Sequence, residues 1–365
     1  MAERAGSSIG QDDLRAAVQA GLLSEAQAAS LAALAADRAG RRRALPAEDE
    51  PFEFFRGLSE IFVSVGLVIL LSGVAALVTW LSGATMLIAI PAVSAAVAWW
   101  WAGYFTLRRR MNLPSMVLAS AYALGVWVSA LTLLAQGELP FRPTVVAAAL
   151  VTMAALWLWF RRFRLPFTMF LFGLAGLAAA YGVTGNVGEL VGLVPGMGIG
   201  LFDLRASPAF SVATLIFGVA AFLGGMWFDT RDPYRLGRHA ATGFWLHMLA
   251  APALVNTVAL TLYNVGGTAG MMLTTAALAL IAVLALVIDR RSFLTAGIVY
   301  IGLIIAWAVR AGGGAGMGHW VAILLILGTL VTALGTWWVT LRAALMRALP
   351  DFPGKSGLPP YSETA

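Results

Sequence analysis

Long apolar runs separated by short polar breaks extend from residue 57 to residue 341. A helix needs about 20 apolar residues to cross the core of a bilayer, and runs of this length recur along the whole segment. The breaks are short, as at Ser82-Gly83, so consecutive spans are predicted to be antiparallel neighbours. The pattern predicts an all-α polytopic transmembrane helical bundle with about ten spans. The predicted spans are residues 57–81, 84–106, 114–135, 142–160, 166–184, 208–228, 240–263, 268–288, 292–309 and 318–341.

The segment before the first span has the pattern of a small helical hairpin. Asp12 or Asp13 can cap a first helix, and Ser24 with Gln27 forms a capping-box pattern that opens a second. Two helices with so few large apolar residues cannot bury a core alone, so we expect the hairpin to need a partner. That partner would be another copy, the cytoplasmic face of the bundle or a second protein. The predicted domains are a cytosolic hairpin (1–39), a charged linker (40–56), the transmembrane domain (57–341) and a partly disordered cytosolic tail (342–365).

One short run in this hairpin carries a family resemblance. The stretch from Gly21 to Ala28 reads Gly-Leu-Leu-Ser-Glu-Ala-Gln-Ala, and a linker and a long series of spans follow it. With that architecture it resembles a bacterial family of predicted multi-pass membrane proteins of unknown function that begin with a cytosolic helical hairpin. A location in a bacterial inner (cytoplasmic) membrane fits this resemblance. It transfers no catalytic residue to the chain.

Composition supports a lipid environment and excludes several kinds of site. The 365 residues are 60% hydrophobic and only 12% charged, whereas soluble domains are about a quarter charged. The lipid bilayer is therefore the expected surrounding partner. The absence of cysteine excludes disulfides, thiolate metal sites and cysteine nucleophiles, and three histidines leave little for a metal site. We expect no metal and no cofactor.

Arginine placement predicts the orientation of the bundle. Cytoplasmic loops of membrane proteins carry an excess of basic residues. The loops after even-numbered spans hold eleven arginines and those after odd-numbered spans only three, so the even loops and both termini are predicted to be cytoplasmic. Topology thus explains the net charge of +6, and no nucleic-acid partner is expected. The eleven are Arg108, Arg109, Arg110, Arg161, Arg162, Arg164, Arg231, Arg235, Arg238, Arg290 and Arg291; the three are Arg142, Arg205 and Arg310.

Ionisable residues inside spans are costly and are functional candidates by default. His247 lies about 10 Å inside the predicted seventh span, at 1.5 Å per residue, and needs a hydrogen-bond partner there. Pro252 leaves the carbonyl of Met248 without its helical donor, so a polar site is expected around these residues. Two interpretations stay open for His247, a structural hydrogen bond or the handling of a substrate or proton.

Other polar residues give weaker candidates. Asn256 and Tyr263 share one face of the seventh span, opposite His247, so this span is predicted to be buried in the bundle. Glu60 near the start of the first span is either an interfacial carboxylate beside Arg56 or a ligand for a proton or cation. Asp289, beside Arg290, is predicted to be a solvated span end. Glycines at helical spacing predict close helix packing at Gly66, Gly73, Gly173, Gly176, Gly328 and Gly335.

The ten spans divide into two halves of five, which would have opposite orientations in the membrane. Pro91 and Pro252 both fall in the second span of their half. Interrupted helices at matching positions of inverted halves are a pointer to a transporter site. No repeat of individual residues supports the division, so the inverted arrangement remains a hypothesis.

Three function classes stay open from the sequence. A scaffold or regulatory subunit that recruits a partner through residues 1–39 is favoured, because intramembrane charges are few. The alternative is a transporter of a small neutral or lipophilic solute that uses Pro91, Pro252, His247, Asn256 and Tyr263. A second alternative is a membrane enzyme acting on a lipid-linked substrate. The enzyme is disfavoured because no metalloprotease, serine-hydrolase or paired-carboxylate motif is present, and no catalytic residue is assigned. Substrate and oligomeric state are not determined.

Overall fold

The computed structural model describes residues 58–82, 86–137, 139–184, 202–232, 235, 238–311, 317–359 and 361, and near the N-terminus residues 17, 20 and 22. The chain divides into two compact units, Met1–Asp49 and Glu50–Ala365. The predicted hairpin (1–39) and linker (40–56) lie almost wholly outside the described residues and stay predictions. Everything that follows concerns the second unit.

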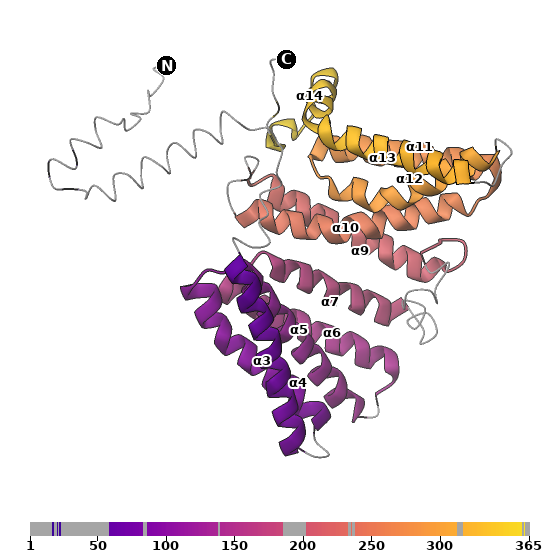
Figure 1. Cartoon of the computed structure of the whole chain (residues 1–365). Helices are drawn as coiled ribbons and strands as arrows, with labels where there is room; N and C mark the ends of the chain where they lie inside the picture. The colour runs from indigo at the N-terminus through magenta and orange to yellow at the C-terminus, as the bar shows by residue number, and fades with distance from the viewer. Residues whose placement is uncertain are drawn as a thin grey trace. The chain divides into compact units, whose positions relative to one another are not determined.

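A helix coincides with each predicted span in the described part of the chain, and no strand occurs there. The all-α polytopic bundle is therefore confirmed. The helices, labelled in Figure 1, are α3 (Leu58–Ser82), α4 (Met86–Ala102), α5 (Asn112–Ala135), α6 (Phe141–Phe163), α7 (Phe167–Thr184), α9 (Pro208–Asp229), α10 (Arg238–Tyr263), α11 (Gly267–Ile288), α12 (Ser292–Ala311), α13 (Met317–Thr336) and α14 (Trp338–Ala348).

Fewer of these helices than ten can cross a membrane by length and composition alone. Among the described residues seven meet both requirements, or eight if the bent pair α13 and α14 forms one span. Helix α4 has only 17 residues before it changes into the π-helix η2 (Gly103–Arg108). At 1.5 Å per residue it covers about 25 Å, short of the roughly 30 Å of a bilayer core. The chain is a multi-pass membrane protein, with seven or eight candidate spans among the described residues.

The last predicted span, residues 318–341, is wrong at its end. The helix breaks at Trp337, and α14 leaves the direction of α13 by 68°. Trp338, the first residue of α14, is buried and packs with α11, so tertiary contacts turn the chain here. In the tail that follows, Lys355–Gly357 form the short helix η3, and Leu358 is buried.

Helix α10 is the central helix of the described bundle. It contacts α7, α9, α11 and α12, and Figure 1 shows it beside α9 between α7 and the α11–α13 group. Of its most apolar stretch 56% is buried, against 11–39% for the other candidate spans. The prediction that the seventh span is buried in the bundle is confirmed. Its sequence suits this place, because buried alanines such as Ala250, Ala251 and Ala259 let neighbouring helices approach closely.

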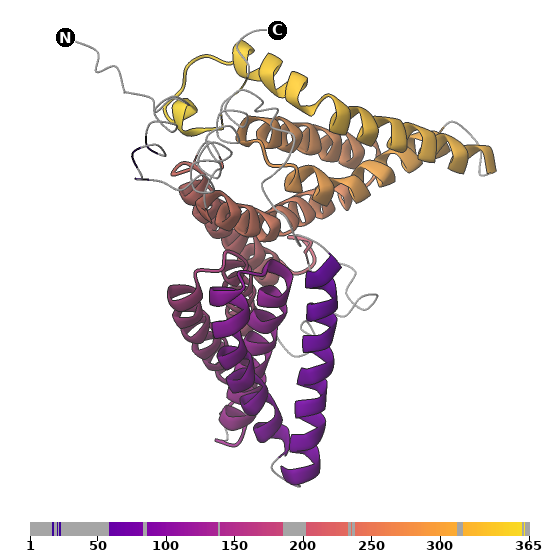
Figure 2. The same cartoon turned by 60° about the vertical axis from the view of Figure 1, so that its left-hand side comes forward.

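Helix α3 is the least buried of the candidate spans. It contacts α4 and α5, and Figure 2 shows it, in the darkest colour, at the edge of their group. Glu60, Ser64 and Leu67 form its buried stripe at helical spacing, all in the half nearer its N-terminus. Its second half, from residue 68 to residue 81, has no buried side chain, so this half is held weakly.

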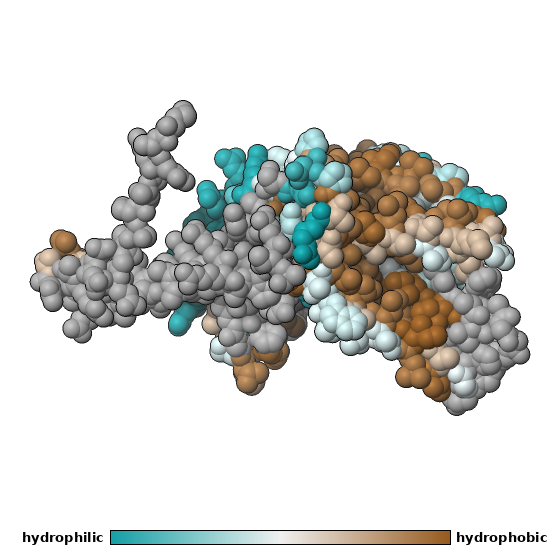
Figure 3. All heavy atoms as spheres, turned by 90° about the horizontal axis from the view of Figure 1, so that it is seen from above, coloured by the Kyte–Doolittle hydropathy of each residue, from teal (hydrophilic) through white to brown (hydrophobic). Residues whose placement is uncertain are grey.

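The described surface is widely apolar. Figure 3 shows large continuous brown areas over the helices, with hydrophilic residues gathered mainly away from them. A water-soluble monomer rarely exposes apolar patches of this size, whereas lipid-facing helices must. The exposed side chains include Leu70, Trp80, Ile216, Leu280 and Leu324.

Close packing at the predicted glycines holds at one position and fails at others. A methyl group at Gly173 would collide with the Leu249 side chain of α10, so the prediction is confirmed there. At four of the others a methyl group would meet no atom of the described residues within 4 Å, so within this part of the chain the prediction is wrong there. Helical spacing of small residues identifies a smooth face, and it does not say whether a neighbour covers that face. The four are Gly66, Gly73, Gly328 and Gly335.

Candidate functional site

A group of buried charges lies where the loops rich in arginine connect the helices. We call this side the arginine-rich end; it holds Arg108–Arg110, Arg161–Arg164, Arg231–Arg238 and Arg290–Arg291. The buried charged residues come from the end of α9, the segment before α10, the turn between α11 and α12, and α14. They are Asp229, Asp289, Arg290 and Arg342, joined by Arg235, whose side chain is 10% exposed.

Asp229, the last residue of α9, binds two partners from other elements. His247 of α10 donates its Nε2–H to Oδ2 at 2.9 Å, since a carboxylate can only accept. Arg290 makes a two-pronged contact, Nε to Oδ2 at 3.0 Å and Nη2 to Oδ1 at 2.5 Å. The same Nη2 donates to the carbonyl of Ala240 in the first turn of α10 at 3.1 Å. Arg290 therefore ties α9, α10 and the α11–α12 turn together.

Two glycines make this contact sterically feasible. A methyl group at Gly225 of α9 would lie 2.8 Å from the His247 ring, so the imidazole packs directly on the α9 backbone. A methyl group at Gly243 of α10 would overlap the Asp229 carboxylate. Any larger residue at either position would push α9 and α10 apart. Close approach of the two helices thus brings the acid and the imidazole together.

The hydrogen-bond partner that His247 needs lies on the neighbouring helix α9. The imidazole is fully buried and binds Asp229, a residue that the sequence analysis did not single out, and not the freed carbonyl of Met248. The ring also lies between Phe222 and Phe293, at 5.5 and 5.9 Å between centroids. Among the described residues its second nitrogen, Nδ1, has no hydrogen-bond partner. The sequence does contain a signal for this pair, because an acid ends one apolar span and a histidine lies inside the next.

Asp289 forms the second half of the charged group. Its carboxylate pairs with Arg235 at 3.1 Å and accepts the indole N–H of Trp338 at 2.7 Å. Arg342 lies 3.8 Å from the same carboxylate and donates to the Pro359 carbonyl of the tail. The prediction of a solvated end was wrong, because Asp289 is only 2% exposed and Arg290 fully buried. Partners from distant segments cover the turn, which local sequence does not reveal.

Buried charges require compensation, since isolated ions in an apolar interior are very costly. The two carboxylates face three guanidinium groups, and both have at least one direct cationic partner. The group therefore carries a net charge of about +1 when His247 is neutral.

Glu60 makes a contact that the sequence analysis did not predict. It is 4% exposed, and its Oε2 accepts the backbone N–H groups of Asn112 and Leu113 at 3.2 and 3.1 Å. These are the first residues of α5, whose amides have no helical partner, and the positive end of the helix dipole favours a carboxylate there. Glu60 thus joins α3 to the start of α5. Arg56, its predicted neighbour, lies outside the described residues.

The remaining candidates of the seventh span do not gather around His247. The Asn256 side chain accepts a hydrogen bond from the Tyr300 hydroxyl of α12. Tyr263 is partly buried at the far end of α10, and Pro252 is exposed. None of these residues, nor His247, lines the large pocket described next.

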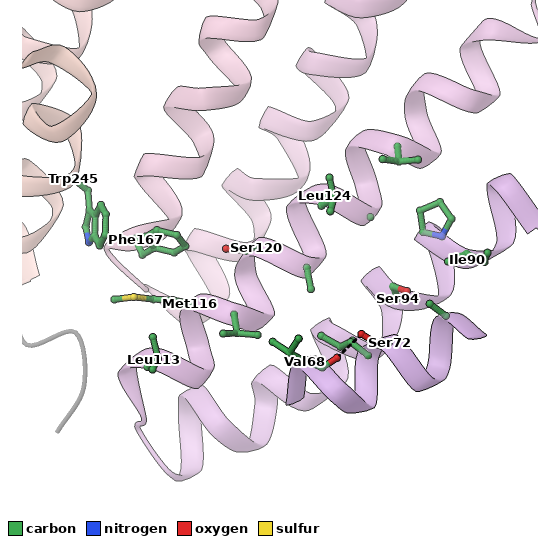
Figure 4. A pocket seen from close by; sticks show the side chains of 17 residues that line it. Val68, Ser72, Ile90, Ser94, Leu113, Met116, Ser120, Leu124, Phe167 and Trp245 are labelled. Carbon is green, nitrogen blue, oxygen red and sulfur yellow. Dashed lines mark hydrogen bonds between the residues drawn. The ribbon is translucent and has the colours of Figure 1, made fainter. Parts of the chain in front are cut away.

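A pocket of about 850 Å³ lies between α3, α4 and α5 and reaches Phe167 of α7 and Trp245 of α10. Figure 4 shows these two rings at one end of the lining and Ile90 at the other. Pro91 also lines it. A methyl group at Gly125 would lie 2.5 Å from the Pro91 carbonyl, so α4 and α5 touch closely beside the pocket.

The lining is apolar apart from three serines. Ser72 donates to the Val68 carbonyl at 2.9 Å, drawn as a dashed line in Figure 4, and Ser94 and Ser120 add two further hydroxyls. Among the described residues, no charged side chain lines the pocket. A smaller pocket of about 350 Å³ shares Ser120 and Leu124 of α5 with the first and is also lined by Trp127 and by residues of α6 and α7. The arrangement suits an uncharged, elongated apolar molecule.

In the described part of the chain no three His, Asp or Glu side chains are placed to hold a metal ion. A scan against protein-family models and searches of curated proteins and of solved structures find no match to this chain. The resemblance drawn from residues 21–28 and the partner predicted for residues 1–39 therefore stay predictions.

Proposed function

We propose that this protein is a membrane carrier for neutral, single-chain lipophilic molecules, which occupy the pocket between α3, α4 and α5. The observation that carries the proposal is the pocket itself. Its volume of about 850 Å³ falls in the range of pockets that bind small molecules, about 300–1,000 Å³.

The length of the pocket supports a lipid-like occupant. Its lining on α5 runs from Leu113 to Val128, which is about 22 Å at 1.5 Å per residue. A bilayer core about 30 Å thick holds two lipid chains end to end, so one chain measures about 15 Å. The pocket therefore accommodates one chain lying along the helices together with a small head group.

Charge and polarity support a neutral head group. An ion placed against this lining would meet no counter-charge, which is costly in an apolar site. The chain itself gains little by leaving lipid for an equally apolar pocket. Selectivity must then come from packing and from the hydroxyls of Ser72, Ser94 and Ser120, which match an alcohol or ester head group such as that of a monoacylglycerol.

The weakly held half of α3 supports access from the bilayer. Val68, Leu71 and Ser72 line the pocket, yet residues 68 to 81 include no buried side chain. Moving this half of α3 would break few contacts, so exchange of the ligand with lipid can occur there. The buried stripe at Glu60, Ser64 and Leu67 would hold the other half in place.

Binding is tested with a photoreactive monoacylglycerol and the protein in nanodiscs. We expect saturable labelling of α3, α4 and α5 that unlabelled monoacylglycerol competes away. Ser94→Phe, which fills the pocket from α4, should lose this labelling. Ala96→Phe is the matched control, because Ala96 is exposed and does not line the pocket. Labelling that is unsaturable, or equal in the two variants, overturns the proposed site.

Carrier activity is tested separately in proteoliposomes that contain a fluorescent monoacylglycerol. A membrane-impermeant reductant quenches only the probe in the outer leaflet, so the rate of further quenching measures how fast the probe moves between leaflets. We expect the native protein and Ala96→Phe to accelerate this movement and Ser94→Phe not to. Pocket labelling without acceleration would make the pocket a fixed lipid site and refute the carrier.

We also propose that the arginine-rich end faces the cytoplasm, as arginine placement favours. The chain has no cysteine, so single cysteines report sidedness directly. An impermeant maleimide applied to intact cells should label Val265→Cys and leave Arg162→Cys unlabelled until the membrane is opened. The reverse pattern would invert the proposed orientation.

A further inference from the structure

The buried charges around His247 are more than packing of α9 and α10 requires. We infer that His247 and Asp229 form a proton-binding site that competes with Arg290 and thereby controls the pocket. This inference rests on the proposed function, since it assigns a regulation to that pocket. Three features carry it: the shared carboxylate, the unused imidazole nitrogen, and the position of Trp245.

The first feature is competition for one carboxylate. Asp229 accepts both from the His247 Nε2–H and from the two-pronged Arg290 contact. Only one positive charge is needed to neutralise it. When His247 is neutral, Arg290 supplies that charge; a protonated His247 can supply it equally well, because it lies at the same oxygen.

The second feature is the free site for a proton. With Nε2–H donated to Asp229, the other nitrogen, Nδ1, holds a lone pair that contacts no hydrogen-bond donor among the described residues. A proton added there makes the ring a cation in a fully buried position. Arg290 already neutralises Asp229, so this added cation and the seated Arg290 compete for the same carboxylate.

The charged groups near His247 belong to the elements that pack against α10. Helix α7, which also packs on α10, carries no charged side chain, and α12 contributes the Phe293 ring. The charged groups are Asp229 on α9, Asp232 and Arg235 before α10, Asp289 and Arg290 between α11 and α12, and, through Asp289, Arg342 on α14.

The exchange conserves the buried charge. A proton from water at the arginine-rich end binds Nδ1 of His247, forming one N–H bond. Arg290 then leaves Asp229 and the Ala240 carbonyl, and water takes the hydrogen bonds that its guanidinium loses. In the reverse step Arg290 returns and the proton passes back to water. One buried cation replaces another each time.

The third feature connects this exchange with the pocket. Trp245 precedes His247 by two residues on α10 and lines the pocket. The centroids of its ring and the Phe167 ring are 4.7 Å apart. Arg290 holds the first turn of α10 through the Ala240 carbonyl. Its departure removes that tie from the segment that positions Trp245. A ligand that fits the pocket with Arg290 seated must then bind more weakly when His247 is protonated, and its binding must release the proton.

The test measures competition by unlabelled monoacylglycerol, which does not itself titrate, at about pH 8 and about pH 5, the range in which histidine changes charge. We expect the native protein to bind at least about tenfold more weakly at the lower pH, a change that one linked proton can produce. His247→Gln, which cannot take the proton, should bind equally at both. His239→Gln is the matched control, an exposed histidine on the same helix stacked on Phe228, and should keep the native dependence.

A second readout covers the case that His247→Gln does not fold. In weak buffer, adding monoacylglycerol to the native protein near the midpoint should release protons, up to about one per bound ligand. Equal affinity at both pH values with no proton release overturns the inference and leaves the proposed function standing. A pH dependence that persists in His247→Gln also overturns it.

Failure of the proposed function gives a different result. If no saturable binding occurs at either pH, the pocket proposal fails, and the proton site is then read by NMR of histidine-labelled protein. A titrating signal that is missing in His247→Gln and present in His239→Gln supports the site. Absence of any titrating His247 signal between about pH 5 and about pH 8 overturns it.

Discussion

The Asp229–Arg290 ion pair should be strongly coupled, and this can be measured as a double-mutant cycle. Arg290 is fully buried and Asp229 is 5% exposed, so at about pH 8, where His247 is neutral, removing either partner leaves a buried charge without compensation. Such a loss costs about 3–5 kcal/mol, whereas replacing both partners by neutral groups is often nearly neutral. We therefore expect Asp229→Asn and Arg290→Gln each to lower the free energy of unfolding by about 3–5 kcal/mol. The double variant should lose much less than the sum, with a coupling of at least about 2 kcal/mol.

The assay is reversible unfolding in mixed micelles, followed by the circular dichroism of the helices. The control cycle uses Asp351→Asn and Lys355→Gln, an ion pair at 3.2 Å whose aspartate is 99% exposed. Exposed pairs of this kind contribute little, so the control coupling should be indistinguishable from zero. If the Asp229–Arg290 coupling is no larger than that of the control, the two charges are solvated in the membrane-embedded protein, and the competition inferred for His247 loses its basis.

Three further stability predictions follow from individual contacts. Gly243→Ala should lower the free energy of unfolding by about 1–3 kcal/mol, because its methyl group overlaps the Asp229 carboxylate. Gly73→Ala, where the methyl group meets no described atom, should raise it by about 0.5–1 kcal/mol. Thermal unfolding in detergent measures both, and stability changes of the same sign would refute the packing. Glu60→Gln removes the charge at the start of α5 and should cost about 0.5–2 kcal/mol; hydrogen exchange should quicken at the first amides of α5, and unchanged exchange there would contradict the cap. Trp338→Phe removes the indole donor to Asp289 and should cost about 1.5–3 kcal/mol; an unchanged unfolding midpoint would show that this hydrogen bond contributes nothing.

The sequence alone was sufficient for the helices of the bundle. An apolar run of about 20 residues has few alternatives in lipid, because only a helix satisfies every backbone group within one segment. The polar residues of the seventh span likewise indicated a buried helix, and α10 is the most buried candidate span. Both properties depend on consecutive residues of one segment.

The charged group required tertiary structure. Asp229 and His247 are 18 residues apart, and Arg290 is 61 residues from Asp229, so no spacing within one helix links them. Asp289 and Arg290 looked like a solvated turn, since the partners that cover them come from α9, α10 and α14. Whether a charge at the end of a span is solvated or buried depends on the segments that pack over it. The sequence of a single segment does not specify those neighbours.

The pocket, like the charged group, depends on the tertiary structure. Pro91 was predicted to interrupt the second span, but α4 continues through it. The cavity beside Pro91 lies where Gly125 lets α4 and α5 touch and where the second half of α3 has no buried side chain. Local sequence determines which residues are apolar and helical. The distances between helices decide where an empty volume remains and which charges meet, and these distances are set by side chains on different segments together.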